Sequence, residues 1–309
     1  MRAQRPTRKG EHLADLIGHT PLLPLRRIAP HLPRRVQLFA KLEGFNPGGS
    51  VKDRAALWML RAAEGAGLTR DRTLLDATSG NTGIAIAMLA AGEGYRATLC
   101  VPSNIAPERR RILKAYGADL VFTPAADGTD GAQKEAASMA ASEPRKYWYL
   151  DQYNNPANWR AHFESTGPEI WRQTGGKITH FVAALGTTGT FVGTGRFLRE
   201  RKAAVRLIGV QPDGPFHGIE GVKHLESAMI PGIWDPDLAD EIVSVSTEDA
   251  QSAVRRLARE EGILAGTSSG AALDAAMRVA ERVRSGRIMT VFPDAGERYL
   301  GERYWGADE

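Results

Sequence analysis

Short hydrophobic runs of strand length alternate along the chain with longer segments in which apolar residues recur at helical spacing. The short runs predict strands at 36–42, 73–77, 97–101, 120–123, 147–150, 178–185, 205–210 and 288–292. The longer segments predict helices at 51–65, 84–91, 107–116, 131–142, 191–199, 247–261 and 269–284. Because strands and helices alternate in this order, the pattern indicates an α/β fold with mostly parallel sheets.

A polar turn at residues 151–156 divides this pattern into two halves, and both halves show the alternation. In the second half, residues 211–237 are irregular, rich in Gly and Pro, and long enough to indicate a functional loop. With 309 residues, 42% of them hydrophobic, the chain can form one large domain or two smaller ones. No membrane segment is predicted, because no hydrophobic run approaches membrane-spanning length, and no signal peptide is expected before the first strand.

The excess positive charge is concentrated at the N-terminus. The basic residues that precede the first acidic residue are Arg2, Arg5, Arg8 and Lys9. These four charges equal the whole net charge of +4, so residues 11–309 sum to zero. We therefore predict a disordered basic tail at residues 1–10 and no nucleic-acid-binding face.

The single cysteine, Cys100, falls in the predicted strand at 97–101 and cannot form an internal disulfide. This usage fits a reducing cytoplasm, and we expect a buried core residue rather than a catalytic thiol. The seven histidines show no metal-ligand spacing and have no cysteine partners, so no metal site is predicted.

The stretch 41–54, K-L-E-G-F-N-P-G-G-S-V-K-D-R, places a lysine in the first turn of a helix. Ser50 is predicted to be the N-cap and Asp53 its capping-box partner. Lys52 would then lie at the positive end of the helix dipole, where its pKa should fall. A lysine that is neutral part of the time can act as a nucleophile or a base, whereas the ordinary alternative is a solvated surface lysine.

Two loops between a predicted strand and a predicted helix are rich in glycine and hydroxyl groups. The first, T-S-G-N-T-G at 78–83, follows the strand at 73–77, at the edge of a parallel sheet where ligands bind. The second, G-T-T-G-T at 186–190, offers consecutive backbone N–H groups at a helix N-terminus, which suits a phosphate group. A plain turn with a hydroxyl cap is the alternative. Neither a Walker A motif nor a dinucleotide-binding fingerprint is present.

A third glycine loop, G-T-S-S-G at 266–270, matches the G-x-S-x-G pattern of serine hydrolases. That mechanism needs an acid and a histidine later in the chain, yet the last histidine, His224, precedes Ser268. The hydrolase interpretation is therefore disfavoured. An activatable lysine, a phosphate loop and a serine at a helix start instead suit pyridoxal phosphate and an amino-acid substrate.

These motifs together resemble the cysteine synthase (O-acetylserine sulfhydrylase) family, B-type, among the fold-type-II pyridoxal-phosphate enzymes. The resemblance extends from I-G-H-T-P-L at 17–22 to G-E-R-Y-L at 296–300. It includes G-S-V-K-D-R, T-S-G-N-T-G, T-G-P-E-I-W at 166–171, G-T-T-G-T and S-S-G-A-A in that order. The fold implied is two domains, each with a mostly parallel twisted sheet flanked by helices.

The resemblance also implies roles for individual residues. Lys52 would hold pyridoxal 5'-phosphate as a Schiff base and serve as the Cα base, Asn81 would contact the ring hydroxyl, and Ser268 the pyridine nitrogen. The residues expected to bind the cofactor phosphate are Gly186, Thr187, Thr188, Gly189 and Thr190. The residues expected to bind the substrate carboxylate are Thr78, Ser79, Gly80, Thr82 and Gln152.

The reaction implied is a ping-pong β-replacement that makes L-cysteine from an O-activated L-serine and sulfide or another sulfur donor, through an α-aminoacrylate intermediate. By the same resemblance, residues 11–45 and 156–309 form a larger cofactor-binding domain. Residues 46–155 form a smaller mobile domain that carries Lys52 and the substrate loop. The resemblance further implies a homodimer.

Two features depart from the family pattern. The usual I-G-N-T-P is here I-G-H-T-P, with His19 in place of Asn. In addition, residues 216–224 carry a basic cluster that includes Lys223. One hypothesis is that Lys223 binds the phosphate of O-phosphoserine. The alternative is that Lys223 is a loop lysine, neutralised by nearby Glu220, and that O-acetylserine is the donor.

Three other functions fit the sequence less well. A cystathionine β-synthase would use homocysteine through the same chemistry, and we expect no regulatory domain after Glu309 that would support this function. A threonine dehydratase or synthase is disfavoured by T-G-P-E-I-W. A non-enzymatic binding protein would be expected to have lost Lys52 or the phosphate loop, and both are intact.

Overall fold

The computed structural model describes residues 10–78 and 80–306, and in this part of the chain two sheets carry the fold. The six-stranded sheet has the order β1-β2-β10-β7-β8-β9, and the four-stranded sheet has the order β5-β4-β3-β6. The strands are β1 Leu22–Leu25, β2 Val36–Leu42, β3 Thr73–Ala77, β4 Arg96–Pro102, β5 Asp119–Thr123, β6 Tyr147–Tyr149, β7 His180–Ala184, β8 Arg206–Pro212, β9 Glu241–Val245 and β10 Gly286–Phe292. The helices are α1 Lys52–Gly65, α2 Asn81–Glu93, α3 Pro107–Ala115, α4 Gly128–Ser142, α5 Pro156–Ala161, α6 Gly167–Thr174, α7 Gly189–Arg201, α8 Thr247–Arg256 and α9 Thr267–Arg282.

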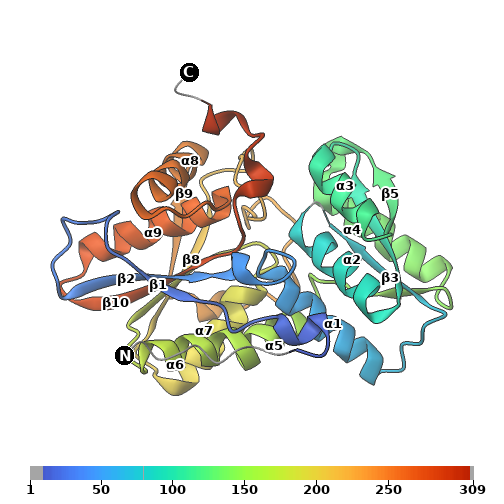
Figure 1. Cartoon of the computed structure of the whole chain (residues 1–309), viewed down its shortest axis with the longest axis horizontal. Coiled ribbons are helices and arrows are strands. Elements are labelled where there is room, and N and C mark those ends of the chain that lie inside the picture. The colour runs from blue at the N-terminus through green and yellow to red at the C-terminus, as the bar shows by residue number, and fades with distance from the viewer. Residues whose placement is uncertain (1–9, 79, 307–309) are drawn as a thin grey trace.

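The six-stranded sheet is parallel except for its edge strand β1, which pairs antiparallel with β2. Helices α8 and α9 lie on one side of this sheet and α6 and α7 on the other (Figure 1). Leu273 of α9 belongs to the buried cluster on the first side, and Phe191 of α7 to the cluster on the second. Both faces of the sheet are therefore covered, as parallel sheets require.

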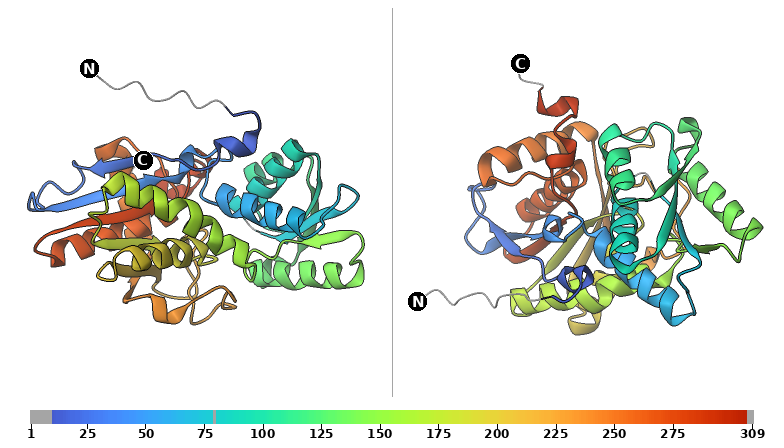
Figure 2. Two further views of the ribbon diagram at one scale, coloured as in Figure 1. Left: turned by 90° about the horizontal axis from the view of Figure 1, so that it is seen from below. Right: turned by 45° about the vertical axis from the view of Figure 1, so that its right-hand side comes forward.

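The four-stranded sheet is wholly parallel and forms a second lobe with α1 to α4 (Figures 1 and 2). All five residues of its central strand β3 are buried. Met59 of α1 and Ile84 of α2 pack with Leu74 on one face, whereas Ala132 of α4 packs with Leu75 on the other. Helix α1, whose first residue is Lys52, therefore packs on the smaller sheet.

The predicted α/β class with mostly parallel sheets is confirmed, but two strands were missed. β1 and β9 are the edge strands of the larger sheet, and neither has a continuous buried run. The predicted capping box at the start of α1 is wrong. Asp53 accepts a hydrogen bond from the backbone N–H of Gly48 at 2.6 Å instead of one from Ser50, and the N-cap is Val51. Of the predicted contacts at the helix start, only the one from the backbone N–H of Lys52 to Oγ of Ser50, at 3.2 Å, is present.

Cys100 is buried and free, and lies in β4 as predicted. Among residues 10–78 and 80–306, no helix combines the length and the apolar character that a bilayer crossing requires. The same residues contain no cluster of histidine, cysteine and acidic side chains that would hold a metal ion.

Asp76 on β3 is a buried carboxylate with one unpartnered oxygen. Its Oδ1 accepts a hydrogen bond from the N–H of Ala77 at 2.8 Å, and Oδ2 has no partner in the described chain. Burial raises the pKa of Asp76 to about 8, although the Ala77 N–H acts in the opposite sense. The native state therefore keeps this proton up to about pH 8, whereas the unfolded chain releases it near its ordinary pKa of 3.8.

We expect Asp76→Asn to stabilise the protein by about 1–2 kcal/mol at pH 8, because asparagine releases no proton on unfolding. Since wild-type stability falls as pH rises from about 4 to about 8, the difference between the two proteins should shrink toward pH 5. Urea unfolding at pH 5 and pH 8 measures it, with the exposed Asp119→Asn as control. A difference that grows toward pH 5 would contradict the assignment.

Candidate active site

A cavity opens where β7 and β10 end and α1, α2, α7 and α9 begin. It contains about 530 Å³ of unfilled space, its open mouth included. The residues that line it are Val51, Lys52, Asn81, Ala183, Ala184, Gly186, Thr187, Thr188, Thr190, Glu220, Gly221, Ser268, Val291 and Pro293. The lysine, the glycine loop at 186–190 and the serine of the third glycine loop, which are far apart in the sequence, therefore meet in one place.

Lys52 is the first residue of α1 and is partly exposed to this cavity. Burial of its ammonium group lowers the pKa of Lys52, and the carboxylate of Asp294 partly opposes this shift. The direction agrees with the sequence prediction, but the main cause is loss of water rather than the helix dipole. A lysine in such a site is neutral more often than a surface lysine and can act as a nucleophile or a base.

The loop at 186–190 joins β7 to α7 and leaves no room for side chains at its glycines. A Cβ on Gly186 would lie 2.1 Å from the carbonyl oxygen of Gly221, and one on Gly189 would lie 2.1 Å from Oδ1 of Asn158. Thr188 has a left-handed φ of 68°, and its buried hydroxyl has no partner among the described residues. The loop thus presents an unsatisfied hydroxyl and a helix N-terminus, which together suit an anion.

His162, on the π-helical turn η4 (His162–Thr166), contacts the loop at 186–190 through Thr190. Its Nε2 lies 3.3 Å from Oγ1 of Thr190, and its Nδ1 lies 2.9 Å from Oγ1 of Thr166. Burial lowers the pKa of His162 to about 3, so the ring is neutral at physiological pH. Sequence reasoning missed this residue, because nothing in its local pattern indicates a contact 28 positions away.

Both polar atoms of the Asn81 side chain, at the start of α2, form hydrogen bonds with the segment at 294–298. Its Nδ2 donates to Oδ2 of Asp294 at 2.7 Å, and its Oδ1 accepts from Nη1 of Arg298. An ionised carboxylate only accepts and a guanidinium only donates, so these partners fix the orientation of the amide. Arg298 also donates to the carbonyl oxygen of Gly48 at 3.0 Å, which ties the loop before Lys52 to the same segment.

Among the described residues predicted to bind substrate, which are Thr78, Gly80, Thr82 and Gln152, none lines the cavity, but hydrogen bonds connect them to one another and to the segment that precedes Asn81. Thr78 Oγ1 accepts from the backbone N–H of Gly80 at 3.1 Å. Thr82 donates to Oε1 of Gln152 at 2.6 Å, and Gln152 donates in turn to the carbonyl oxygen of Ala77 at 2.7 Å. Ser79, predicted to bind substrate, lies outside the described residues.

The pairing of Lys223 with Glu220, which the sequence analysis gave as one alternative, is wrong. Lys223 Nζ donates to Oδ1 of Asp130 at 2.9 Å and does not line the cavity. Glu220, which does line it, pairs instead with Arg109 of α3. The basic residue that pairs with Glu220 is thus Arg109, which the sequence analysis did not consider.

Ser268 lies in the first turn of α9, at the cavity wall. In the described part of the chain it forms no hydrogen bond with a histidine, which a serine nucleophile would need. The structure therefore adds no support to the hydrolase interpretation.

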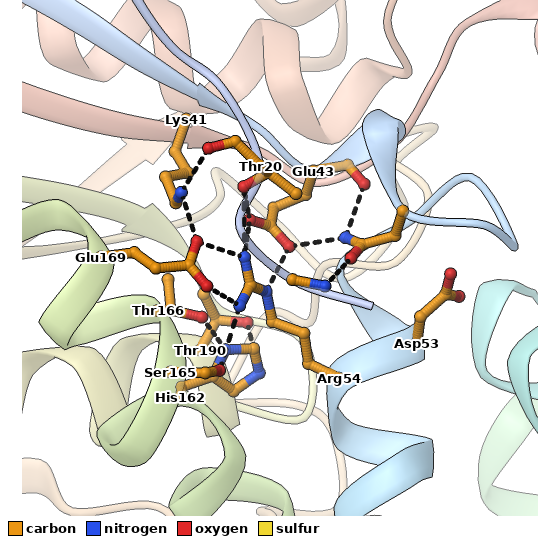
Figure 3. A network of polar contacts seen from close by, with 12 residues as sticks. Thr20, Lys41, Glu43, Asp53, Arg54, His162, Ser165, Thr166, Glu169 and Thr190 are labelled. Atoms are coloured by element: carbon orange, nitrogen blue, oxygen red, sulfur yellow. Dashed lines mark hydrogen bonds and ion pairs between the residues drawn. The ribbon is translucent and has the colours of Figure 1, made fainter. Parts of the chain in front are cut away.

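A buried ionic network anchors α1 two residues after Lys52 (Figure 3). Arg54 Nε donates to Glu43 at 2.7 Å, and Arg54 Nη1 donates to Glu169 at 2.7 Å. Lys41 donates to Glu169 at 2.6 Å, so two cations and two carboxylates balance. His19, at a φ of 49°, donates its backbone N–H to Glu169 at 2.8 Å, so the unusual histidine lies on this network rather than in the cavity.

The comparisons with known proteins agree with this geometry. A family model described as "Pyridoxal-phosphate dependent enzyme" matches residues 13–294. The chain is 51% identical to a cysteine synthase of Aquifex aeolicus over 302 residues, with 96% of this chain and 92% of that protein covered. It is 45% identical to cysteine synthase B of Salmonella typhimurium, with 96% of each covered. A crystal structure of cysteine synthase from Entamoeba histolytica superimposes with a TM-score of 0.94 at 34% identity, covering 100% of this chain and 94% of that one.

The fold and the cavity thus define a pyridoxal-phosphate-dependent enzyme. Within that class, the chain belongs to the cysteine synthase family. The residues present fit the cofactor: one cavity is lined by a lysine of lowered pKa, by a loop whose glycines leave the backbone N–H groups uncovered by side chains, and by Thr188, whose hydroxyl has no partner among the described residues.

Proposed function

We propose that this protein makes L-cysteine from O-acetyl-L-serine and sulfide by pyridoxal-phosphate-dependent β-replacement. The observation that carries the proposal is that Lys52 and the loop at 186–190 line one cavity, as a cofactor with an aldehyde and a phosphate requires. The family match and the cysteine synthases at 43–51% identity support the same reaction.

The roles of the cavity residues follow from their chemistry. When bound, pyridoxal phosphate withdraws electrons from the Cα of an attached amino acid and makes the Cα proton acidic. Lys52 would hold the cofactor covalently and, once released by substrate, would take the Cα proton as a neutral amine. Residues 186–190 would bind the phosphate through N–H groups and hydroxyls, with Thr190 oriented by His162.

Asn81 and Ser268 would position the cofactor ring. Because Asp294 and Arg298 hold the amide of Asn81, one N–H of that amide remains to donate toward the cavity. Ser268 would meet the pyridine nitrogen with a hydroxyl, which, unlike a carboxylate, does not keep that nitrogen protonated. A less electron-withdrawing ring favours elimination at Cβ over transamination.

The loop at 78–82, together with Gln152, would bind the α-carboxylate of the substrate. We also propose that the smaller lobe, residues 46–155, moves over the substrate and excludes water during the reaction. Residues 11–45 and 156–309 would form the larger domain. We further propose a homodimer in the cytoplasm, a setting that the free, buried Cys100 supports.

The donor is assigned to O-acetyl-L-serine because Asp130 already neutralises Lys223. We expect Lys223→Ala to change kcat/KM for O-acetyl-L-serine and O-phospho-L-serine by the same factor, within about twofold. Steady-state rates with both donors measure this. A selective loss with O-phospho-L-serine would make Lys223 a phosphate-binding residue and contradict the assignment.

The direct test of the proposed function is product formation by the holoenzyme. O-acetyl-L-serine with sulfide should give L-cysteine, and replacing sulfide with homocysteine should give far less thioether product. Preferential use of homocysteine would instead identify a cystathionine-forming enzyme with the same cofactor chemistry.

A further inference from the structure

Glu220 lines the cavity that, by the proposed function, accepts the carboxylate of an amino acid. Its side chain is 37% exposed, and one carboxylate oxygen contacts Nη2 of Arg109. Its backbone N–H donates to Oγ1 of Thr267 at 3.1 Å, so the backbone of Glu220 is fixed while its side chain remains accessible. Without a cation beside it, Glu220 would repel an anionic substrate.

Arg109 reaches this carboxylate from the other lobe. It lies on α3, its side chain is 9% exposed, and its guanidinium carbon lies 5.4 Å from the centre of the Tyr299 ring. A Cβ on Gly80 would lie 3.7 Å from Nη1 of Arg109. The guanidinium therefore lies against Gly80, in the segment predicted to bind substrate, as well as against Glu220.

We propose that Arg109 supplies the positive charge that attracts the substrate α-carboxylate to the loop at 78–82, and that Glu220 occupies Arg109 while no substrate is bound. This inference rests on the proposed function. Arg109 would then be a specificity-determining residue for amino acids with a free carboxylate, and Glu220 an internal competitor for the same cation.

The chemistry of the loop explains why a cation is needed. Its hydroxyls, backbone amides and the amide of Gln152 can hydrogen-bond a carboxylate but bring no net charge. A carboxylate that leaves water is costly to bury unless a cation compensates it. Arg109 is the guanidinium that the structure places against Gly80, and it presents several N–H donors that can be shared between two anions.

The competing explanation is that the Arg109–Glu220 ion pair is a strut, meaning that it only holds the two lobes together. A second ion pair between the same lobes can serve as the control. Lys223 and Asp130 also join the segment near residue 220 to the smaller lobe, at 2.9 Å. In that pair the cation comes from the loop and the carboxylate from α4, and neither lines the cavity. A variant that breaks the Lys223–Asp130 pair therefore shows the effect of losing a contact between the lobes while the charges beside the substrate loop stay the same.

The two explanations predict different signs. If Arg109 and Glu220 form only a strut, then removing either residue loosens the same contact and both variants shift ligand affinity in the same direction. If Glu220 competes with the substrate, then Glu220→Gln strengthens carboxylate binding while Arg109→Gln weakens it. The sign of the change, rather than its presence, therefore identifies the role.

The experiment is equilibrium binding of L-serine, which has the carboxylate but no activated leaving group, to the holoenzyme, followed by the visible absorbance of the cofactor. We expect Arg109→Gln to raise the Kd about tenfold, the effect of losing one charge-assisted hydrogen bond, and Arg109→Lys to retain most of the affinity. Glu220→Gln should lower the Kd about threefold, and Asp130→Asn should change it by less than about twofold.

Shifts of the same sign in Arg109→Gln and Glu220→Gln, or a change in Asp130→Asn as large as theirs, would overturn the inference. If Arg109→Gln does not fold, Glu220→Gln carries the test, and an unchanged or raised Kd in that variant overturns the inference. A wild-type protein that binds no cofactor would contradict the proposed function instead, so the two failures are distinguishable.

Discussion

Lys52→Ala is expected to lower the rate of L-cysteine formation at least about 10³-fold and to abolish covalent attachment of the cofactor. In our account this one amine both holds the cofactor and moves the Cα proton. Its burial, which lowers the pKa of Lys52, is what makes the neutral amine available. No other lysine lines the cavity in the described part of the chain, so no neighbouring amine can substitute.

The measurement combines rates with chemical trapping. Borohydride reduction of the wild-type holoenzyme, followed by peptide mass spectrometry, should find the cofactor on the peptide that contains Lys52. The exposed Lys114→Ala is the control and should retain both rate and label. Cofactor trapped on a different lysine, or normal turnover by Lys52→Ala, would rule out the assignment.

Arg54→Met is expected to destabilise the protein by about 3–5 kcal/mol, because it leaves buried carboxylates without a counter-charge. The exposed fractions of the Arg54, Glu43 and Glu169 side chains are 1%, 0% and 4%. Lys41 alone would then have to balance two carboxylates. The network also fixes the first turn of α1, so we expect activity to fall together with stability (Figure 3).

The control is an exposed ion pair on the same helix. Arg61 pairs with Glu64 at 2.7 Å, with exposed side-chain fractions of 46% and 24%. Arg61→Ala should therefore cost less than about 1 kcal/mol. Urea unfolding of the two variants beside the wild type measures both effects. Equal, small losses would show that the buried network is no more important to stability than a surface pair.

The sequence predicted those parts of the fold that depend on local hydrophobic pattern. β3 and β4 are buried on both faces and are mostly apolar in sequence, although β3 contains Asp76. β9 was missed because it is an edge strand whose residues are mostly exposed or half-buried. The capping box failed for a different reason: Asp53 is near enough in sequence to cap the helix, but the preceding glycine loop folds back and takes its carboxylate.

In the candidate site, too, local motifs could be predicted from the sequence, whereas contacts between distant segments could not. Each cavity loop carries a local motif, so Lys52, the loop at 186–190 and Ser268 could be predicted before the structure. The partners of charged residues could not. Arg109 and Glu220 are 111 positions apart, and Lys223 and Asp130 are 93 apart. Only the packing of the two lobes decides which carboxylate meets which cation, so proximity in sequence wrongly paired Glu220 with Lys223.

The measurement that tests the central claim most directly is the visible spectrum of the purified holoenzyme before and after O-acetyl-L-serine is added. Our account predicts a yellow protein whose spectrum changes on addition of the donor and returns to its starting form when sulfide is added, with release of L-cysteine. A folded protein that stays colourless with added pyridoxal phosphate, or a spectrum that the donor leaves unchanged, would contradict the account.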